Sequence, residues 1–232
     1  MNREAVIGFM KEHQNNCPNY SISRYIKSRQ KCDFCQHVNR DTTMLMTRVR
    51  GARKTVDVGI ALVPYCAVER YQPYSMAGFD VIYQKGKTEP ERIRHVFTRA
   101  FNSGYQRVVL LSHSIPHLPL DFLDDALYIL RNDKKMVLGP LQNGMFYLIG
   151  MTRHAYGNGL YSSIWNKIFF DDQSNRDMAM ESLHGCLHDI ALLPEWYLVK
   201  NIDDLRRFYQ DNMRGHGWYA PWTRGIADKI FS

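Results

Sequence analysis

Residues 107–150 constrain the fold more than any other part of this chain. They contain three short apolar runs, Val108–Leu111, Met136–Leu138 and Met145–Ile149, each ending at small residues or proline. A segment with helical spacing of leucines, Leu120–Leu130, separates the first run from the second. Apolar strands joined through a helix are typical of a largely parallel sheet, whose carboxyl edge forms a ligand crevice. We therefore expect the ends of all three strands to face one crevice.

The rest of the chain continues this alternation of strands and helices. Further strands are predicted at Ala5–Met10, Val56–Val63, Phe79–Tyr83 and Ile190–Leu193. Further helices are predicted at Phe34–Val49, Glu89–Phe101, around Met178–Leu187 and at Ile202–Tyr209. The pattern predicts one α/β domain over residues 1–212 and an aromatic C-terminal tail, residues 213–232, packed on it.

Composition excludes several classes of protein. The chain has 232 residues, of which 45% are hydrophobic, so it is not intrinsically disordered. No apolar run approaches the length of a membrane span, and the apolar core of residues 1–12 is too short for a signal peptide, so we expect a cytoplasmic protein. The five cysteines form no disulfide framework, and Cys32, Cys35 and His37 are one ligand short of a structural zinc site.

Positive charge is concentrated in the first quarter of the chain. Residues 1–56 contain 11 Lys and Arg against 4 Asp and Glu, whereas the remainder is balanced at 19 of each. Such a field favours phosphate-bearing partners, which include nucleotide diphosphates, nucleic acids and anionic membrane surfaces. The alternative is a solvated basic helix face. Nucleic-acid binding is disfavoured because no recognisable binding module accompanies the charge.

The predicted crevice has an unusual set of polar side chains. The strand ends and the loops after them offer Ser112, His113, Ser114, His117 and Asn143, with no Asp or Glu. A divalent cation that holds phosphates in such a crevice normally needs carboxylate ligands. The predicted scaffold is typical of an enzyme, but the crevice lacks the carboxylates that would bind a metal ion.

Motifs along most of residues 5–208 resemble those of a known group of proteins. The matches include Gln84, Gly86 and Arg92, then Val108–Leu110 with Pro116, and then Leu138–Pro140 followed by Tyr147–Gly150. In these motifs the chain resembles the bacterial glycosyltransferase-like proteins of the radical-SAM/selenodomain-associated transferase type. Those proteins are relatives of the nucleotide-diphospho-sugar transferases and of the molybdenum-cofactor and phospholactate guanylyltransferases. The resemblance implies a glycosyltransferase-A-like α/β fold with a central, mostly parallel sheet flanked by helices.

The resemblance also implies a nucleotide or nucleotide sugar as ligand. The positions that correspond to the nucleotide-binding motifs, whether or not they keep the family residue, are Lys11, Ser23, Arg24, Gln84, Gly86, Arg92, Ser114, Gly139, Pro140, Asn143 and Gly144. For the glycines, the simpler interpretation is that they form turns.

The chain departs from the family pattern at its acidic positions. Five family Asp positions are occupied by Ser114, His117, Asn143, Leu198 and Lys200. Their loss removes the negative charge that would hold Mg²⁺ or Mn²⁺, so a metal cofactor is disfavoured, with Mg²⁺ or Mn²⁺ left as the alternative.

Two hypotheses about function follow. In the first, the protein transfers a sugar without metal: Lys200, with Arg24 and Arg92, would stabilise the leaving diphosphate, and His113 or His117 would be the general base. In the second, the protein is a non-catalytic relative that binds a ligand or a partner. A nucleotidyltransferase and nucleic-acid binding through the basic quarter remain further alternatives. The simpler alternative is that the three candidate catalytic residues have no catalytic role. In that case His113 and His117 bond to the backbone of their loop, and Lys200 is exposed to solvent.

Overall fold

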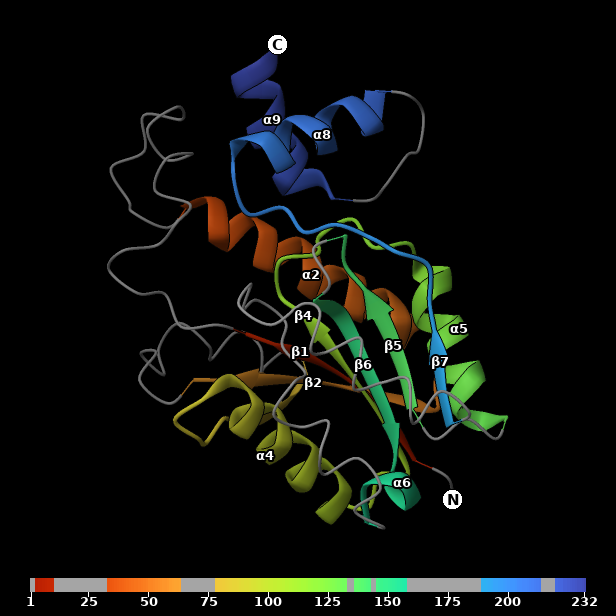
Figure 1. Ribbon diagram of the computed structural model, residues 1–232. Coiled ribbons are helices and arrows are strands. Elements are labelled where there is room, and N and C mark those ends of the chain that lie inside the picture. The colour runs from red at the N-terminus through yellow and green to blue at the C-terminus, as the bar shows by residue number, and fades with distance from the viewer. Residues whose placement is uncertain are drawn as a thin grey trace.

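Seven strands in the described part of the chain form one sheet with the order β3-β2-β1-β4-β6-β5-β7 (Figure 1). The structure is a computed structural model that describes residues 3–10, 33–63, 78–132, 136–142, 145–157, 189–213 and 220–232. The strands are β1 (Glu4–Phe9), β2 (Val56–Leu62), β3 (Asp80–Tyr83), β4 (Arg107–Ser112), β5 (Met136–Pro140), β6 (Phe146–Thr152) and β7 (Ile190–Leu192). The helices are α2 (Asp33–Ala52), α4 (Glu89–Asn102), α5 (Leu120–Arg131), α6 (Arg153–Gly157), α8 (Ile202–Asp211) and α9 (Pro221–Phe231).

The sheet is mostly parallel, as predicted. Strands β3, β2, β1 and β4 run parallel to one another, and β7 runs parallel to β5. The exception is β6, which is antiparallel to both β4 and β5. The α/β fold class is therefore confirmed, and the predicted strands lie within a few residues of the observed ones.

The direction of β6 corrects the expectation that three strand ends face one crevice. Its last residue, Thr152, pairs with Arg107 at the start of β4. The carboxyl end of β6 thus lies at the opposite edge of the sheet from the carboxyl ends of β4 and β5. The reason is the short connection from β5 to β6, because strands joined by a few residues pair as an antiparallel hairpin.

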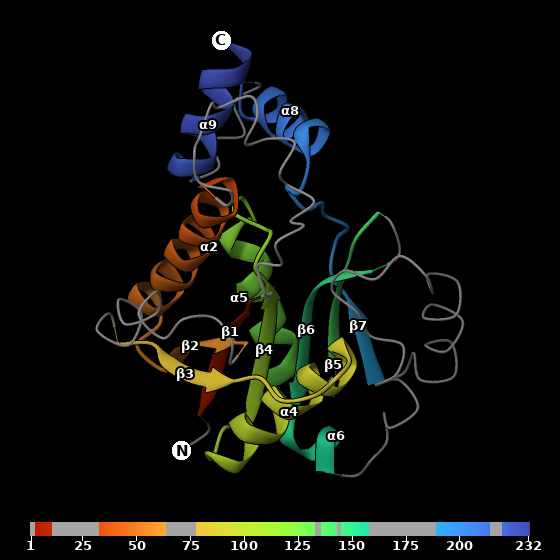
Figure 2. The same cartoon turned by 90° about the vertical axis from the view of Figure 1, so that its left-hand side faces the viewer.

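Helices cover the two faces of the sheet in separate layers (Figure 2). Because successive side chains of a strand point to opposite faces, Ala5, Ile7 and Phe9 pack with α4, whereas Val6 packs with α2 and α5. The face of α4 also carries the short α6, whose Ala155 joins the same apolar cluster.

A third apolar cluster lies at one end of the molecule, where α8 and α9 meet the start of α2 (Figure 1). It contains Phe34 and Val38 of α2, Phe208 of α8 and Ile226 of α9. The buried carboxylate of Asp41 in α2 accepts hydrogen bonds from the backbone N–H groups of Trp222 (3.4 Å) and Thr223 (2.7 Å). Asp41 therefore caps the first turn of α9 from another helix and fixes the C-terminal segment to α2.

The helix predicted around Met178–Leu187 lies outside the described residues.

Candidate functional site

The loop after β4 carries His113 and Ser114 and is held by two distant segments. Thr42 Oγ1 in α2 donates to the carbonyl oxygen of His113, 2.9 Å away. The carbonyl oxygen of Ser114 accepts a hydrogen bond from the backbone N–H of Val199 at 3.0 Å. The side chains of the two residues also bond to each other, with 3.0 Å between Ser114 Oγ and His113 Nε2. This loop is therefore a fixed feature at the carboxyl edge of the parallel strands.

The segment from Leu193 to Lys200 runs along the ends of the neighbouring strands. The N–H of Leu193 donates to the Leu138 carbonyl (2.8 Å), and the N–H of Trp196 donates to the Pro140 carbonyl (3.1 Å). Together with the Val199 bond, these contacts bring Leu198 and Lys200 to the loop after β4. Four of the five positions at which the resembling family has Asp therefore belong to one region of the fold; the fifth, Asn143, lies outside the described residues.

Three of these four side chains are buried. Ser114 is 5% exposed, His117 1% and Leu198 7%. Leu198 is part of the apolar cluster beneath α2 and α5. Serine, histidine and leucine in a closed environment provide no anionic oxygen, so these residues do not fit a magnesium or manganese ion.

His117 is enclosed by aromatic rings. Its ring centroid lies 4.3 Å from that of Tyr197, 5.3 Å from Phe208 and 5.4 Å from Trp196. Burial, with a smaller contribution from the nearby Arg207 guanidinium, lowers the pKa of His117 to about 3. The imidazole is therefore neutral at physiological pH, and in this conformation its enclosure keeps it from reaching a substrate.

His113 and Lys200 are the half-buried members of the group. The backbone N–H groups of Lys200 and Asn201 donate to the Asp204 carboxylate at 3.0 and 3.3 Å. Asn201 Oδ1 in turn accepts from the N–H of Asp204, so the two side chains form a capping box at the start of α8. The carboxylate next to Lys200 is thus committed to a helix cap.

At the end of β3, Gln84 joins three strands. Its side chain is 1% exposed, and its Nε2 donates to the carbonyl oxygens of Met10 (2.7 Å) and Ala61 (2.8 Å). Because both partners are acceptors, the amide nitrogen must face them, and Oε1 is fixed on the other side. Oε1 is buried and has no hydrogen-bond partner in the described part of the chain. Gln84 therefore holds the carboxyl ends of β1, β2 and β3 together and keeps one acceptor free.

Gly86 and Arg92 belong to the turn into α4. Gly86 has φ +141°, and a Cβ there would lie 2.6 Å from Cβ of Glu91, so the turn requires glycine. The Glu91 carboxylate accepts from the N–H groups of Lys87 (2.6 Å) and Thr88 (3.2 Å), and these bonds lower its pKa. Backbone donors that could bind a phosphate are thus occupied by Glu91, while Arg92 Nη1 donates to the Lys87 carbonyl at 3.3 Å.

Gly139 and Pro140 end β5. A Cβ at Gly139 would overlap the ring of Tyr147, whose hydroxyl donates to the Pro194 carbonyl at 3.0 Å. Gly139 thus makes room for an aromatic side chain that ties β6 to the 193–200 segment.

The remaining predicted nucleotide-binding residues lie outside the described residues: Lys11, Ser23, Arg24, Asn143 and Gly144. Those that are described fall into two groups, one at the end of β3 and one at the ends of β4 and β5. Strands β2 and β1 separate the end of β3 from that of β4, so about 14 Å lies between the two groups at the usual strand spacing.

Several basic residues in α2 and just after it have partners within the protein. The Arg40 guanidinium lies 4.2 Å from the ring centroid of Trp222, Arg50 donates to the Gly78 carbonyl (3.0 Å), and Arg53 pairs with Asp124 (2.5 Å). Part of the positive charge of residues 1–56 is therefore engaged in contacts within the protein.

Within the described ranges, no group of three or more His, Cys, Asp or Glu side chains is arranged to hold a metal ion. None of the helices in those ranges is both long and apolar enough to cross a lipid bilayer.

A cavity that the sequence interpretation missed lies between α4 and β3. It has a volume of about 520 Å³, and its lining includes Arg3, Asp80, Lys85, His95, Arg99 and Tyr105. His95 and Arg99 are four residues apart on α4, so they share one face of that helix. This spacing is visible in the sequence, but the sequence interpretation of this helix considered only its apolar face.

Comparisons with known proteins agree with this architecture. Residues 47–167, just over half of the chain, match the family described as uncharacterized proteins conserved in bacteria, DUF2064. No curated protein sequence matches the chain.

Solved structures share the fold over nearly the whole chain. A provisionally assigned nucleotide-diphospho-sugar transferase from Desulfovibrio desulfuricans G20 has a TM-score of 0.79 at 21% identity, covering 99% of this chain and 97% of that one. CMP:2-keto-3-deoxy-manno-octonic acid synthetase complexed with CTP has a TM-score of 0.54 at 10% identity, covering 91% and 99%. The 4-diphosphocytidyl-2C-methyl-D-erythritol synthase from Anaerococcus prevotii DSM 20548 has a TM-score of 0.55 at 10% identity, covering 92% and 96%. The predicted nucleotide-diphospho-sugar transferase fold is confirmed.

Proposed function

The chain belongs to the bacterial DUF2064 family, and we propose that it binds a nucleotide or nucleotide sugar along the carboxyl ends of β3, β2, β1 and β4 and transfers the sugar without a metal ion. The observation that carries this proposal is the likeness to a nucleotide-diphospho-sugar transferase over 99% of the chain. Open α/β sheets bind ligands outside the carboxyl ends of their strands, where the strand order reverses. In this sheet that place lies between β1 and β4.

The groups at this edge suit a nucleotide. Gln84 is 1% exposed, so it fixes the carboxyl ends of β1, β2 and β3 at this edge rather than contacting a ligand itself. Lys200 at the β4 end supplies a positive charge for a diphosphate. The separation of about three strand spacings leaves room for the base at one group and the phosphates at the other.

Within this proposal His113 is the general base and Lys200 stabilises the leaving group. The imidazole of His113 takes the proton of the acceptor hydroxyl, whose oxygen forms a bond to the anomeric carbon of the sugar while the bond from that carbon to the diphosphate breaks. The departing diphosphate carries the electron pair, and the Lys200 ammonium stabilises its charge. His117, buried and neutral, is a packing residue here, because it supports the 193–200 segment.

One experiment tests nucleotide binding and its independence from metal. The thermal unfolding of the purified protein is followed with CTP, GTP, UDP-glucose and GDP-mannose, each in EDTA and in Mn²⁺. At 100 times its Kd, a ligand that binds only the folded state adds about 2.7 kcal/mol of stability. We expect at least one of these compounds to stabilise the protein equally in EDTA and in Mn²⁺. Stabilisation that needs Mn²⁺ would contradict a metal-free site, and no stabilisation by any nucleotide would contradict the proposed ligand class.

A second candidate function is non-catalytic binding of the same ligand. The enclosure of His117 favours this second function, because it removes one of the two candidate bases. Only His113, which is half-buried, is left to act as a base. Release of nucleoside diphosphate from a stabilising nucleotide sugar, followed by ³¹P NMR with and without glycerol as acceptor, separates the two functions. Turnover that is lost in His113→Ala supports transfer, whereas binding without turnover supports the second candidate.

A further inference from the structure

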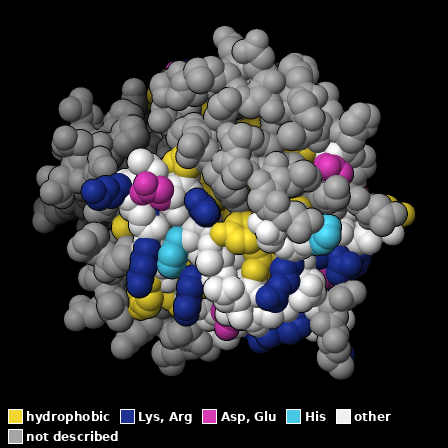
Figure 3. Space-filling model, turned by 60° about the horizontal axis from the view of Figure 1, so that its bottom comes forward, with side chains coloured by type: hydrophobic (Ala, Val, Ile, Leu, Met, Phe, Trp, Pro, Cys, Tyr) yellow, Lys and Arg dark blue, Asp and Glu magenta, His cyan; other side chains and the backbone are white. Residues whose placement is uncertain are grey.

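We propose that the cavity between α4 and β3 binds a small phosphate monoester with an apolar body, at a site separate from the proposed nucleotide site. The cavity lies on the α4 face of the sheet, and strands β1, β2 and β3 line it with α4. In the space-filling view, Lys and Arg side chains gather on this side of the molecule with a histidine among them (Figure 3). A volume of about 520 Å³ is in the range of small-molecule sites.

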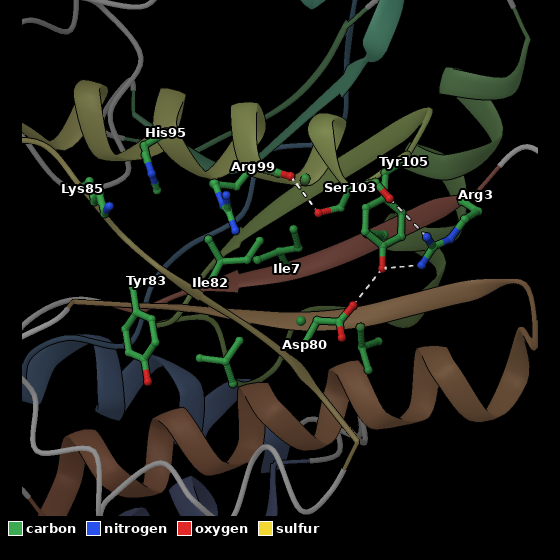
Figure 4. Close-up of a pocket in the computed structure, with 15 residues that line it drawn as sticks. Arg3, Ile7, Asp80, Ile82, Tyr83, Lys85, His95, Arg99, Ser103 and Tyr105 are labelled. Carbon is green, nitrogen blue, oxygen red and sulfur yellow. Dashed lines mark hydrogen bonds between the residues drawn. The ribbon is translucent and has the colours of Figure 1, made fainter.

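One end of the cavity is cationic. Lys85 follows β3, and His95 and Arg99 project from α4 towards the same space (Figure 4). The side chains of Lys85 and Arg99 form no ion pair with any described residue. Burial, together with the nearby charges of Lys85 and Arg99, lowers the pKa of His95. Nδ1 of His95 is buried without a hydrogen-bond partner in the described ranges.

The other end of the cavity is closed by its own hydrogen bonds. The Tyr105 hydroxyl donates to the carboxylates of Asp57 (3.0 Å) and Asp80 (2.9 Å). Arg3 donates to Asp57 Oδ2 (2.9 Å) and to the Tyr105 oxygen (3.2 Å). The carboxylates repel an anion from this end, so a charged ligand head belongs at the Lys85 end.

The floor between the two ends is apolar. Ile7 of β1 and Ile82 of β3 lie there (Figure 4), and the lining also includes Ala5 of β1 and Ala100 of α4. A ligand body without charge covers this surface and removes it from water. Two permanent positive charges and a histidine match the dianion of a phosphate monoester better than the single charge of a carboxylate. The ligand class is therefore a phosphate monoester with a compact apolar body.

Phenyl phosphate is the probe that combines these features. The protein is titrated with phenyl phosphate, inorganic phosphate, benzoate and phenol by calorimetry, and in parallel by NMR of the histidine ring protons. His95→Gln identifies the His95 resonance among those of the nine histidines. We expect saturable binding of phenyl phosphate, weaker binding of the other three compounds and a shift of the His95 resonance.

Matched variants separate the site from general surface charge. Lys85→Gln and Arg99→Gln should each weaken phenyl phosphate about fivefold to tenfold, because each removes one charge that contacts the head. Lys87→Gln and Arg94→Gln remove exposed charges from the same turn and helix but from outside the cavity lining, and should change affinity less than about twofold.

Three results would overturn the proposal. The first is no saturable binding of phenyl phosphate, or binding that leaves His95 unshifted. The second is equal weakening by the control variants. The third is benzoate or phenol binding as tightly as phenyl phosphate, which contradicts a site for a dianionic head. Nucleotide binding is tested separately through His113, which follows β4 and is not in the cavity lining.

Discussion

The loop after β4 and the cavity beside α4 both gather polar and basic side chains, but they use them differently. At the loop, Ser114 bonds to His113 and His117 is packed among aromatic rings. In the cavity, Lys85 and Arg99 face an open space of about 520 Å³ without an ionic partner in the described residues. The polar side chains of the loop are therefore packed against other protein groups, whereas the basic side chains of the cavity face a space that an anion could occupy.

This difference follows from how closely the 193–200 segment packs against the loop after β4. The hydrogen bond between Val199 and Ser114 keeps the 193–200 segment where the resembling family has its acidic groups. The side chains in that place now stabilise the fold through burial and aromatic contacts. His113 and Lys200 are the half-buried side chains of this region, so in the proposed function they are the ones that contact the ligand.

The largest effect is expected when a carboxylate is returned to the packed region. His117→Asp should destabilise the protein by about 3–5 kcal/mol in urea unfolding at pH 7.5, because the charge would be buried among Trp196, Tyr197 and Phe208. The matched variant His113→Asp, at a half-buried position, should cost about 1 kcal/mol or less. Equal stabilities of the two variants would show that position 117 is open to solvent.

A second large effect concerns acid. The pKa of His117 is about 3 in the folded protein and 6.5 in the reference state, so below pH 6.5 only the unfolded chain binds its proton. Stability that is complete above pH 6.5 is therefore lost as the pH falls towards 3, at about 1.4 kcal/mol per pH unit. His117→Phe keeps an aromatic ring and removes this proton. In urea unfolding at pH 6, 5 and 4, its free energy of unfolding should fall less steeply than that of the original chain; parallel curves would contradict the burial of His117.

An intermediate effect is expected where a motif glycine makes room for packing. Gly139→Ala should lower stability by about 1–3 kcal/mol, because the new methyl group meets the Tyr147 ring. Gly157→Ala is the control, since a Cβ there has nothing within 4 Å. Thermal unfolding of both variants measures the difference. A neutral Gly139→Ala that loses nucleotide affinity would assign the glycine to the ligand instead.

The smallest effect is expected at the half-buried Lys200 on the carboxyl edge. Lys200→Gln should weaken the best nucleotide ligand about fivefold, which is roughly 1 kcal/mol for one partly screened charge. Lys229→Gln, an exposed lysine in the last turn of α9, should leave the affinity unchanged. Calorimetric titration in EDTA measures both. An unchanged Kd in Lys200→Gln would remove Lys200 from the site.

Local sequence signals predicted the elements well where they depend on nearby residues. The start of α4 is an example, because Thr88 and Glu91 form a capping box within one turn. The direction of β6 was predicted wrongly, because the expectation rested on the apolar run alone and not on the short connection from β5, which favours an antiparallel hairpin. The helix α9 was not predicted, because its cap, Asp41, lies about 180 residues away in the chain.

In the candidate site, the exposure of individual side chains could not be predicted from nearby residues either. His113 and His117 belong to one motif, yet one is half-buried and the other enclosed, because Trp196, Tyr197 and Phe208 come from a segment far along the chain. The sequence placed Ser114, His117, Leu198 and Lys200 in one group, and the structure brings these four residues into one region. It could not tell which of the replacing side chains would face solvent, because that depends on packing between distant segments.

The most direct test of the account is an NMR titration that follows His113 and His95 in one experiment, with resonances assigned from His113→Ala and His95→Gln. The titrant is whichever nucleotide or nucleotide sugar stabilises the protein most, added in EDTA. A ligand bound at the carboxyl edge without metal should shift the His113 resonance, leave that of His95 in place, and give the same Kd after Mn²⁺ is added. A His113 resonance that stays unchanged at saturation, or that moves only once Mn²⁺ is present, would contradict the central claim.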